Sequence, residues 1–233
     1  VTFFKSSNPG PVEAPLIDND MKITRGTAAV ALQNDYGHTS GALRLYYNWG
    51  HHNINDGHTA DEQPRTSLYL HDDVMAGVSL YQSVELFGGN RTTVGFDYQH
   101  FGGKAWNRAI EGGAETVIAD KTQDEYAAYV DIRQDITPWL TAGAGLRVDH
   151  HSRSGTQLVP QGGLSFLLPH NAQIKAMVSK GFRFPTIREM YMFPPQNPDL
   201  KPEKLMNYEL SFTQRVSDGA LSYGVSVYYI DGD

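Results

Sequence analysis

The chain of 233 residues carries a net charge of -7 and contains no cysteine. A surface that binds nucleic acid normally shows clustered Lys and Arg, and the sequence has no such cluster, so we expect no nucleic-acid partner. The apolar runs are far shorter than the about 20 residues that a membrane-spanning helix needs. The sequence has 23 Gly, 13 Tyr and 10 Phe, and its apolar residues are scattered singly, which favours β-structure.

Apolar and polar residues alternate along most of the chain, which is the pattern of a strand with two different faces. Between Gly41 and Gly50, for example, the odd positions are Leu, Leu, Tyr and Trp, whereas the even positions are Ala, Arg, Tyr and Asn. The alternation predicts about ten strands, at 23–33, 41–50, 74–86, 94–99, 125–133, 140–149, 158–168, 173–179, 208–215 and 221–229.

The lengths of these strands and of their connections indicate a membrane barrel. Strands of about 9 to 11 residues cross a bilayer when they are tilted. Tight turns at 34–39, 88–90, 137–138, 169–171 and 217–219 alternate with longer connections at 53–72, 104–123, 152–156 and 181–204. An up-and-down barrel places alternate connections on opposite rims. We therefore predict an all-β fold, an up-and-down antiparallel transmembrane β-barrel segment of the outer membrane.

The apolar side chains at alternate positions of each strand predict the surface that contacts outer-membrane lipid. Seven residues represent it: Leu43, Leu45, Val78, Leu80, Phe96, Val130 and Leu146. If they form a continuous belt, the protein needs lipid or detergent to cover them.

The most specific pattern lies in two segments, SKGFRFPTIREMY at 179–191 and NPDLKPEKLMNYEL at 197–210. They resemble the part of TonB-dependent receptors where a strand ending in Gly-Phe-Arg-x-Pro-Thr precedes a short helix containing Glu-hydrophobic-Tyr. In that family Asn-Pro-x-Leu-Lys-Pro-Glu and a strand opening on Tyr-Glu come next. The matching residues are Gly181, Phe182, Arg183, Pro185, Thr186, Glu189, Tyr191, Asn197, Pro198, Leu200, Lys201, Pro202, Glu203, Tyr208 and Glu209.

Physically, this motif is best interpreted as a structural element. Pro185 fixes its own φ and pushes Phe184 out of the helical region, so the strand should end there. Pro198 and Pro202 should hold the returning limb extended. Five charged residues are candidates for ion pairs: Arg183, Arg188, Glu189, Lys201 and Glu203. We expect the motif to stabilise the fold rather than to contact a ligand.

The resemblance implies a 22-stranded barrel filled by an N-terminal plug domain that TonB recognises. It also implies import of a scarce small-molecule nutrient, namely an iron-siderophore, haem, cobalamin, another metal complex or an oligosaccharide, without catalysis and without a cofactor. The sequence shows no plug, no TonB-contacting segment and no terminal strand ending in an aromatic residue. We therefore expect residues 1–233 to be an internal piece of the barrel domain, which meets TonB only through a plug domain.

Histidines gather on the side of the longer connections: His51, His52, His58, His71, His150 and His151. Neutral imidazoles suit zinc, copper and iron, so these residues are candidate ligand contacts. Exposed loops also collect polar residues for no functional reason, and we favour that interpretation and assign no metal. Adjacent residues of a strand point to opposite faces, so His51 and His52 should not share one ion.

Two alternatives from other classes remain open. An omptin-like outer-membrane protease would use paired acidic and Asp-His groups, for which Asp72, Asp73, Asp149 and His150 are candidates. A soluble β-sandwich that binds glycans would instead pack these alternate apolar side chains between two sheets. The sequence contains no nucleophile elbow, phosphate loop or zinc-protease helix, so we expect the protein not to be an enzyme.

Overall fold

The computed structural model describes residues 2–216 and 219–232, which form one antiparallel sheet of eleven strands. The strands are β1 (Thr2–Ser6), β2 (Asp20–Asp35), β3 (Thr39–Asn55), β4 (Ser67–Val84), β5 (Asn90–Ala109), β6 (Glu115–Thr137), β7 (Leu140–His151), β8 (Gly155–Leu168), β9 (Ala172–Arg183), β10 (Glu203–Val216) and β11 (Leu221–Gly232). Each strand pairs with its neighbours in chain order, so the predicted up-and-down fold is confirmed. β1 pairs with β2 and was not predicted from the sequence.

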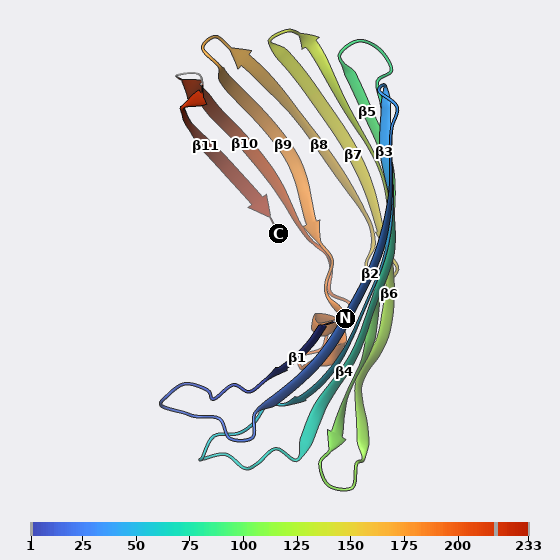
Figure 1. The fold of residues 1–233 in the computed structure, drawn as a ribbon, viewed down its shortest axis with the longest axis vertical. Coiled ribbons are helices and arrows are strands. Elements are labelled where there is room, and N and C mark those ends of the chain that lie inside the picture. The colour runs from blue at the N-terminus through green and yellow to red at the C-terminus, as the bar shows by residue number, and fades with distance from the viewer. Residues whose placement is uncertain (1, 217–218, 233) are drawn as a thin grey trace.

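The connections alternate between the two ends of the curved sheet (Figure 1). Short turns at 36–38, 85–89, 138–139 and 169–171 lie at its upper end, and the connections 7–19, 56–66, 110–114, 152–154 and 184–202 follow the opposite strand ends. The predicted turn that begins at Ser217 lies outside the described residues, apart from Gly219.

The predicted long connections 53–72 and 104–123 are wrong in extent, because strand structure continues into both. β6 alone has 23 residues, about twice what a tilted strand needs to cross a bilayer. Beyond the membrane neither face of a strand meets lipid, so the alternation that marks a membrane strand in the sequence fades there.

The seven predicted lipid-facing residues share one face of the sheet, which we call the outer face. Leu43 pairs with Leu80, which pairs with Phe96, and Val130 pairs with Leu146. Leu80 is 47% exposed, so no second sheet covers it among the described residues. The alternative of a soluble β-sandwich, with these residues packed between two sheets, is therefore wrong.

The apolar part of the outer face ends at a definite height on β3 and β4. Trp49 and Val74 are its last members there, and the side chains of the next outward residues, His51 and Asp72, are hydrogen-bonded to each other. We take the membrane-spanning parts of β3 and β4 to end at this boundary, which leaves His52 and His71 beyond it.

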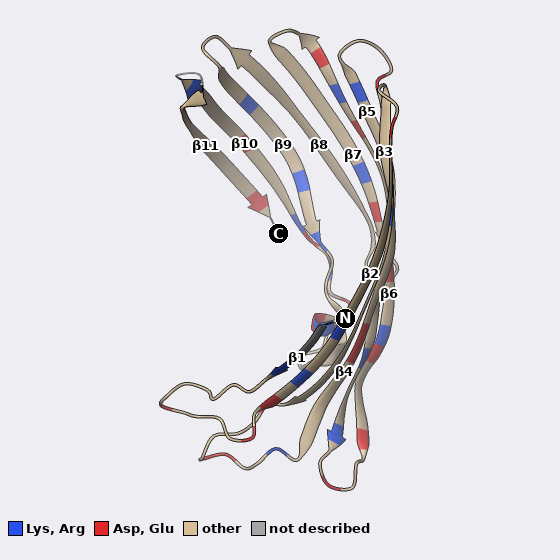
Figure 2. Ribbon diagram, in the orientation of Figure 1, with Lys and Arg blue, Asp and Glu red and all other residues tan. Residues whose placement is uncertain are grey.

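The opposite, inner face lines the concave side of the sheet. There the β9–β10 connection folds back onto the strands together with its short helix η1 (Arg188–Met192) (Figure 1). Met190 of η1 and His151 of β7 are fully buried, so the small core lies beneath this connection. Charged residues are spread over strands and connections rather than gathered in one block (Figure 2). The described helical structure includes no segment with the length and apolar character to cross a bilayer.

Candidate functional site

Four charged or titratable side chains meet on the inner face, just beyond the boundary of the apolar belt. They are Arg25 of β2, His52 of β3, and His71 and Asp73 of β4, and we call them the inner-wall cluster. His52 of β3 pairs directly with His71 of β4. Two residues before His52, Gly50 pairs with Arg25 of β2 on one side and with Asp73 of β4 on the other. A Cβ atom at position 50 would overlap Asp73 Oδ2, so glycine at this position lets Arg25 and Asp73 meet.

The inner-wall cluster is held by short polar contacts. Arg25 Nη2 donates to Asp73 Oδ1 at 2.7 Å, and Arg25 Nη1 lies 3.1 Å from His52 Nε2. Because a guanidinium has donors and no acceptor, Nε2 of His52 must be the unprotonated ring nitrogen. His52 Nε2 also lies 3.2 Å from Asp73 Oδ2, and the His52 and His71 ring centroids are 5.4 Å apart.

The electrostatics of the inner-wall cluster favour neutral imidazoles. Burial lowers the pKa of His52 and of His71, and the nearby Asp73 carboxylate opposes this shift without cancelling it. Asp73 Oδ2 is buried and accepts no hydrogen bond from the described residues. Ligand atoms of His52, His71 and Asp73 all lie within 4.8 Å of one another. In chemical terms the inner-wall cluster can hold a metal ion.

The structure separates the other candidate histidines from this pair. His51 points outward to Asp72, and His150 points outward to Thr156, whereas His151 is buried on the inner face of β7 against Phe184. His58 is buried in the β3–β4 connection, whose backbone bonds Ile17. The opposite directions of His51 and His52 are as predicted. A ligand role for any of the six remains a prediction.

The family motif folds into an ionic lock at the start of the β9–β10 connection. β9 ends at Arg183, two residues before the buried Pro185, as predicted from the proline. The Arg183 guanidinium donates two hydrogen bonds to Glu189, both at 3.0 Å, and two to Glu203, at 3.0 and 2.7 Å. Thr186 and Glu189 bond each other's backbone N–H groups, in the manner of a capping box at the start of η1.

Glu189 lies outside the strands, and its charge is strongly favoured. The Arg183 guanidinium, with help from Thr186, lowers the pKa of the Glu189 carboxyl to about 2. Arg183 likewise lowers the pKa of Glu203. Of the five residues suggested for ion pairs, Arg183, Glu189 and Glu203 thus join, while the Arg188 guanidinium lies 5.2 Å from the Phe193 ring centroid.

The rest of the motif supports the turn and the neighbouring strands. Lys121 of β6 lies over the Tyr191 ring, and the Asn197 side chain accepts from the Asp199 backbone N–H. Phe182 packs edge-on against Phe184, and Tyr208 lies near Tyr229 on the outer face. These contacts are consistent with a structural role for the motif, which remains a prediction.

A cavity of about 540 Å³ lies between the β9–β10 connection and the inner face of the sheet. On the sheet side its walls include Arg25, His71, Asp73 and Glu125, and on the connection side Arg188. The volume falls within the range of about 300 to 1,000 Å³ that is usual for small-molecule sites. The inner-wall cluster thus opens into a space large enough for a ligand.

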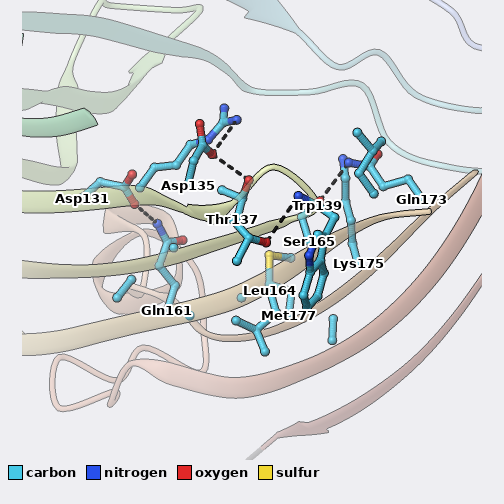
Figure 3. Close-up of a pocket in the computed structure, with 18 of the residues that line it drawn as sticks. Asp131, Asp135, Thr137, Trp139, Gln161, Leu164, Ser165, Gln173, Lys175 and Met177 are labelled. Atoms are coloured by element: carbon cyan, nitrogen blue, oxygen red, sulfur yellow. Dashed lines mark hydrogen bonds and ion pairs between the residues drawn. The ribbon is translucent and has the colours of Figure 1, made fainter. Parts of the chain in front are cut away.

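A second hollow, of about 620 Å³, lies on the sheet near the short turns (Figure 3). Gly143 and Gly163 pair there and bring no side chains. The surrounding polar groups bond one another, as Gln161 Nε2 does with Asp131 Oδ2 at 2.9 Å (Figure 3). This hollow therefore offers a smooth floor with a polar rim.

The four residues proposed for a protease do not converge. Asp73 points inward and Asp72 outward, and Asp149 and His150 likewise occupy opposite faces of β7. β4 and β7 are separated by β5 and β6, so their backbones lie about 14 Å apart at the usual strand spacing.

A single up-and-down sheet with an apolar outer face and a polar inner face is the wall of an outer-membrane β-barrel. Residues 4–233 match the family described as TonB dependent receptor-like, beta-barrel. The chain belongs to this family, whose barrels lie in the outer membrane and serve transport, so the protease alternative is wrong.

Similar proteins agree with this assignment. The vitamin B12 transporter BtuB of Photobacterium profundum is 30% identical over 112 residues, which are 48% of this chain and 18% of that protein. The ferric enterobactin receptor PfeA of Pseudomonas aeruginosa, solved as a Q482A mutant with enterobactin, matches with a TM-score of 0.70 and 18% identity. The match covers 92% of this chain and 35% of PfeA. The copper transporter OprC matches with a TM-score of 0.74 and 14% identity, over 91% of this chain and 39% of OprC. The chain therefore spans less than half the length of each of these proteins.

Proposed function

We propose that the chain forms part of the barrel wall of a TonB-dependent receptor that imports a scarce small-molecule nutrient across the outer membrane. The observation that carries this proposal is the contrast between the two faces of the sheet. The outer face is apolar, whereas the inner face presents the inner-wall cluster and a cavity of about 540 Å³ toward the concave side.

The complete receptor, in this proposal, has a barrel of 22 strands and a plug domain that contacts TonB. The eleven described strands then supply about half of the wall. The hollow near the short turns faces the space that the plug would fill. Ligand selection would fall to the opposite end, where the inner-wall cluster and the β9–β10 connection lie.

The nutrient class is proposed from the named relatives together with the inner wall. PfeA is a ferric enterobactin receptor, BtuB a vitamin B12 transporter and OprC a copper transporter, and each cargo contains a metal. An iron-siderophore, haem, cobalamin or another metal complex is therefore the class to test first.

The test is uptake by cells that carry or lack the complete receptor, in strains with and without TonB. Radiolabelled cobalamin and ferric enterobactin, haem and copper would each be offered at limiting concentration. We expect one of them to accumulate only when both the receptor and TonB are present. If no metal-containing nutrient depends on the receptor, the proposal for this cargo class fails.

A further inference from the structure

The contacts of the inner-wall cluster leave one buried carboxylate oxygen without a hydrogen-bond partner among the described residues. His52 Nε2 accepts from Arg25, so it has no proton to donate to Asp73 Oδ2, 3.2 Å away. Asp73 Oδ2 is buried and accepts no hydrogen bond from any described residue. A buried carboxylate oxygen without a partner is destabilised, and a cation that took the place of Arg25 at His52 Nε2 would satisfy both Nε2 and Oδ2.

The spacing of these atoms fits a metal ion. Metal–nitrogen and metal–oxygen bonds of about 2.0 to 2.2 Å in tetrahedral geometry place two ligand atoms about 3.3 Å apart. The separation of His52 Nε2 and Asp73 Oδ2 is 3.2 Å, and one ligand atom from each of His52, His71 and Asp73 lies within 4.8 Å of the other two. The His71 ring would need to move by up to about 1.5 Å to complete the set.

We propose that His52, His71 and Asp73 bind a divalent first-row transition metal ion, Cu²⁺ or Zn²⁺, during its passage along the inner wall of the receptor. Imidazole favours these metals, whereas Ca²⁺ and Mg²⁺ take oxygen ligands. Iron in a siderophore or cobalt in cobalamin already has its ligands filled, so neither needs this set. The inference rests on the proposed function and narrows its cargo to a metal that still exchanges ligands.

Arg25 makes this a site for transit rather than for a permanent ion. Its guanidinium already holds the His52 Nε2 lone pair, at 3.1 Å, and the other carboxylate oxygen of Asp73, Oδ1, at 2.7 Å. An incoming ion must displace a positive charge that remains close by, which lowers the affinity. Half of the Arg25 side chain is exposed, so it has room to swing away. The open cavity beside His71 and Asp73 gives the ion a route in and out.

The experiment measures Cu²⁺ and Zn²⁺ binding to the complete purified receptor in detergent by chelator competition, with electron paramagnetic resonance of the copper form. We expect one site with nitrogen coupling from two imidazoles. His52→Ala and His71→Ala should each weaken binding more than about tenfold, because loss of a ligand costs at least as much as loss of its supporting partner. Arg25→Gln should tighten binding, by about tenfold, because it removes the competing cation.

His150→Ala is the matched control, because His150 points outward and bonds Thr156. The metal affinity of this variant should equal that of the wild type. Unchanged affinity in His52→Ala and His71→Ala, or weaker binding in Arg25→Gln, overturns the inference. If a histidine variant does not fold, the wild-type spectrum decides: a copper signal without two imidazole nitrogens, or no binding at all, overturns it as well. Binding needs neither TonB nor transport, so a receptor that imports a nutrient without binding metal refutes this inference alone.

Discussion

The two faces of the sheet use the same backbone and the same strands, yet they follow opposite rules. On the outer face Leu146 lies between Val130 and Pro160 and is 40% exposed, with apolar neighbours on both sides. One residue along β7, on the inner face, Arg147 bonds two carboxylates. The difference shows that the outer face needs only apolar character, whereas a buried charge on the inner face, such as that of Asp149, is held by a partner.

The strongest test of this difference places the same charge on both faces at one depth. Leu146→Arg puts a guanidinium into lipid near the middle of β7, and we expect the free energy of unfolding in a bilayer to fall by about 2 to 4 kcal/mol. Gln161→Arg lies on the inner face one row away, beside Asp131, and should change the free energy by less than about 1 kcal/mol.

Urea titration of the complete receptor in phospholipid vesicles, followed by gel mobility, measures both values. The contrast between the two variants is the decisive quantity, because each carries one added positive charge. Equal losses in Leu146→Arg and Gln161→Arg would mean that the outer face does not contact hydrocarbon.

The sequence predicted the outer face well and the inner face poorly, for a physical reason. Contact with hydrocarbon imposes one simple requirement at every second residue, and Leu43, Leu80 and Phe96 meet it wherever they pair. Inner-face partners come from different strands, and their meeting depends on register. Arg25 and Asp73 are 48 residues apart and meet only because Gly50 lies between them.

The extension of the strands beyond the membrane was also not predicted, because the polar segment 115–124 of β6 shows no alternation of apolar, lipid-facing and polar, lumen-facing residues. By contrast, the β9–β10 motif could be placed correctly from the sequence. Its proline fixes the end of the strand, and Thr186 and Glu189 have the capping-box spacing of three residues. Local rules of this kind survive without knowledge of register.

The second prediction concerns the need of a buried inner-face charge for a partner. Arg147 donates to Asp97 at 2.6 Å and to Asp149 at 2.9 Å, and Asp149 is buried. Arg147→Met keeps the bulk of the side chain and leaves both carboxylates unpaired. Because the Arg147 side chain is 37% exposed, water screens part of the loss, and we expect the free energy of unfolding to fall by about 1 to 2 kcal/mol.

The rescue variant for this pair combines Arg147→Met with Asp97→Asn and Asp149→Asn. Neutral amides remove the unpaired charge, so most of the lost stability should return in the same urea titration. If Arg147→Met alone unfolds like the wild type, the inner face tolerates unpaired charge, and the contrast between the faces is weaker than proposed.

The smallest effect is expected at the ionic lock of the β9–β10 connection, whose charged side chains are exposed. The Glu189 pKa is lowered to about 2 by Arg183 and Thr186, from an ordinary value of 4.5. A lowered pKa means that the carboxylate stabilises the folded connection fully above pH 4.5 and loses this effect as the pH falls toward 2. The wild-type connection should therefore become susceptible to pepsin over that window, near Tyr191.

Glu189→Gln should be susceptible already at about pH 4, whereas Glu111→Gln in the β5–β6 turn should match the wild type when rates are normalised to a peptide substrate. Equal cleavage of wild type and Glu189→Gln at that pH would show that packing of Met190, rather than the ion pairs, holds the connection against the sheet.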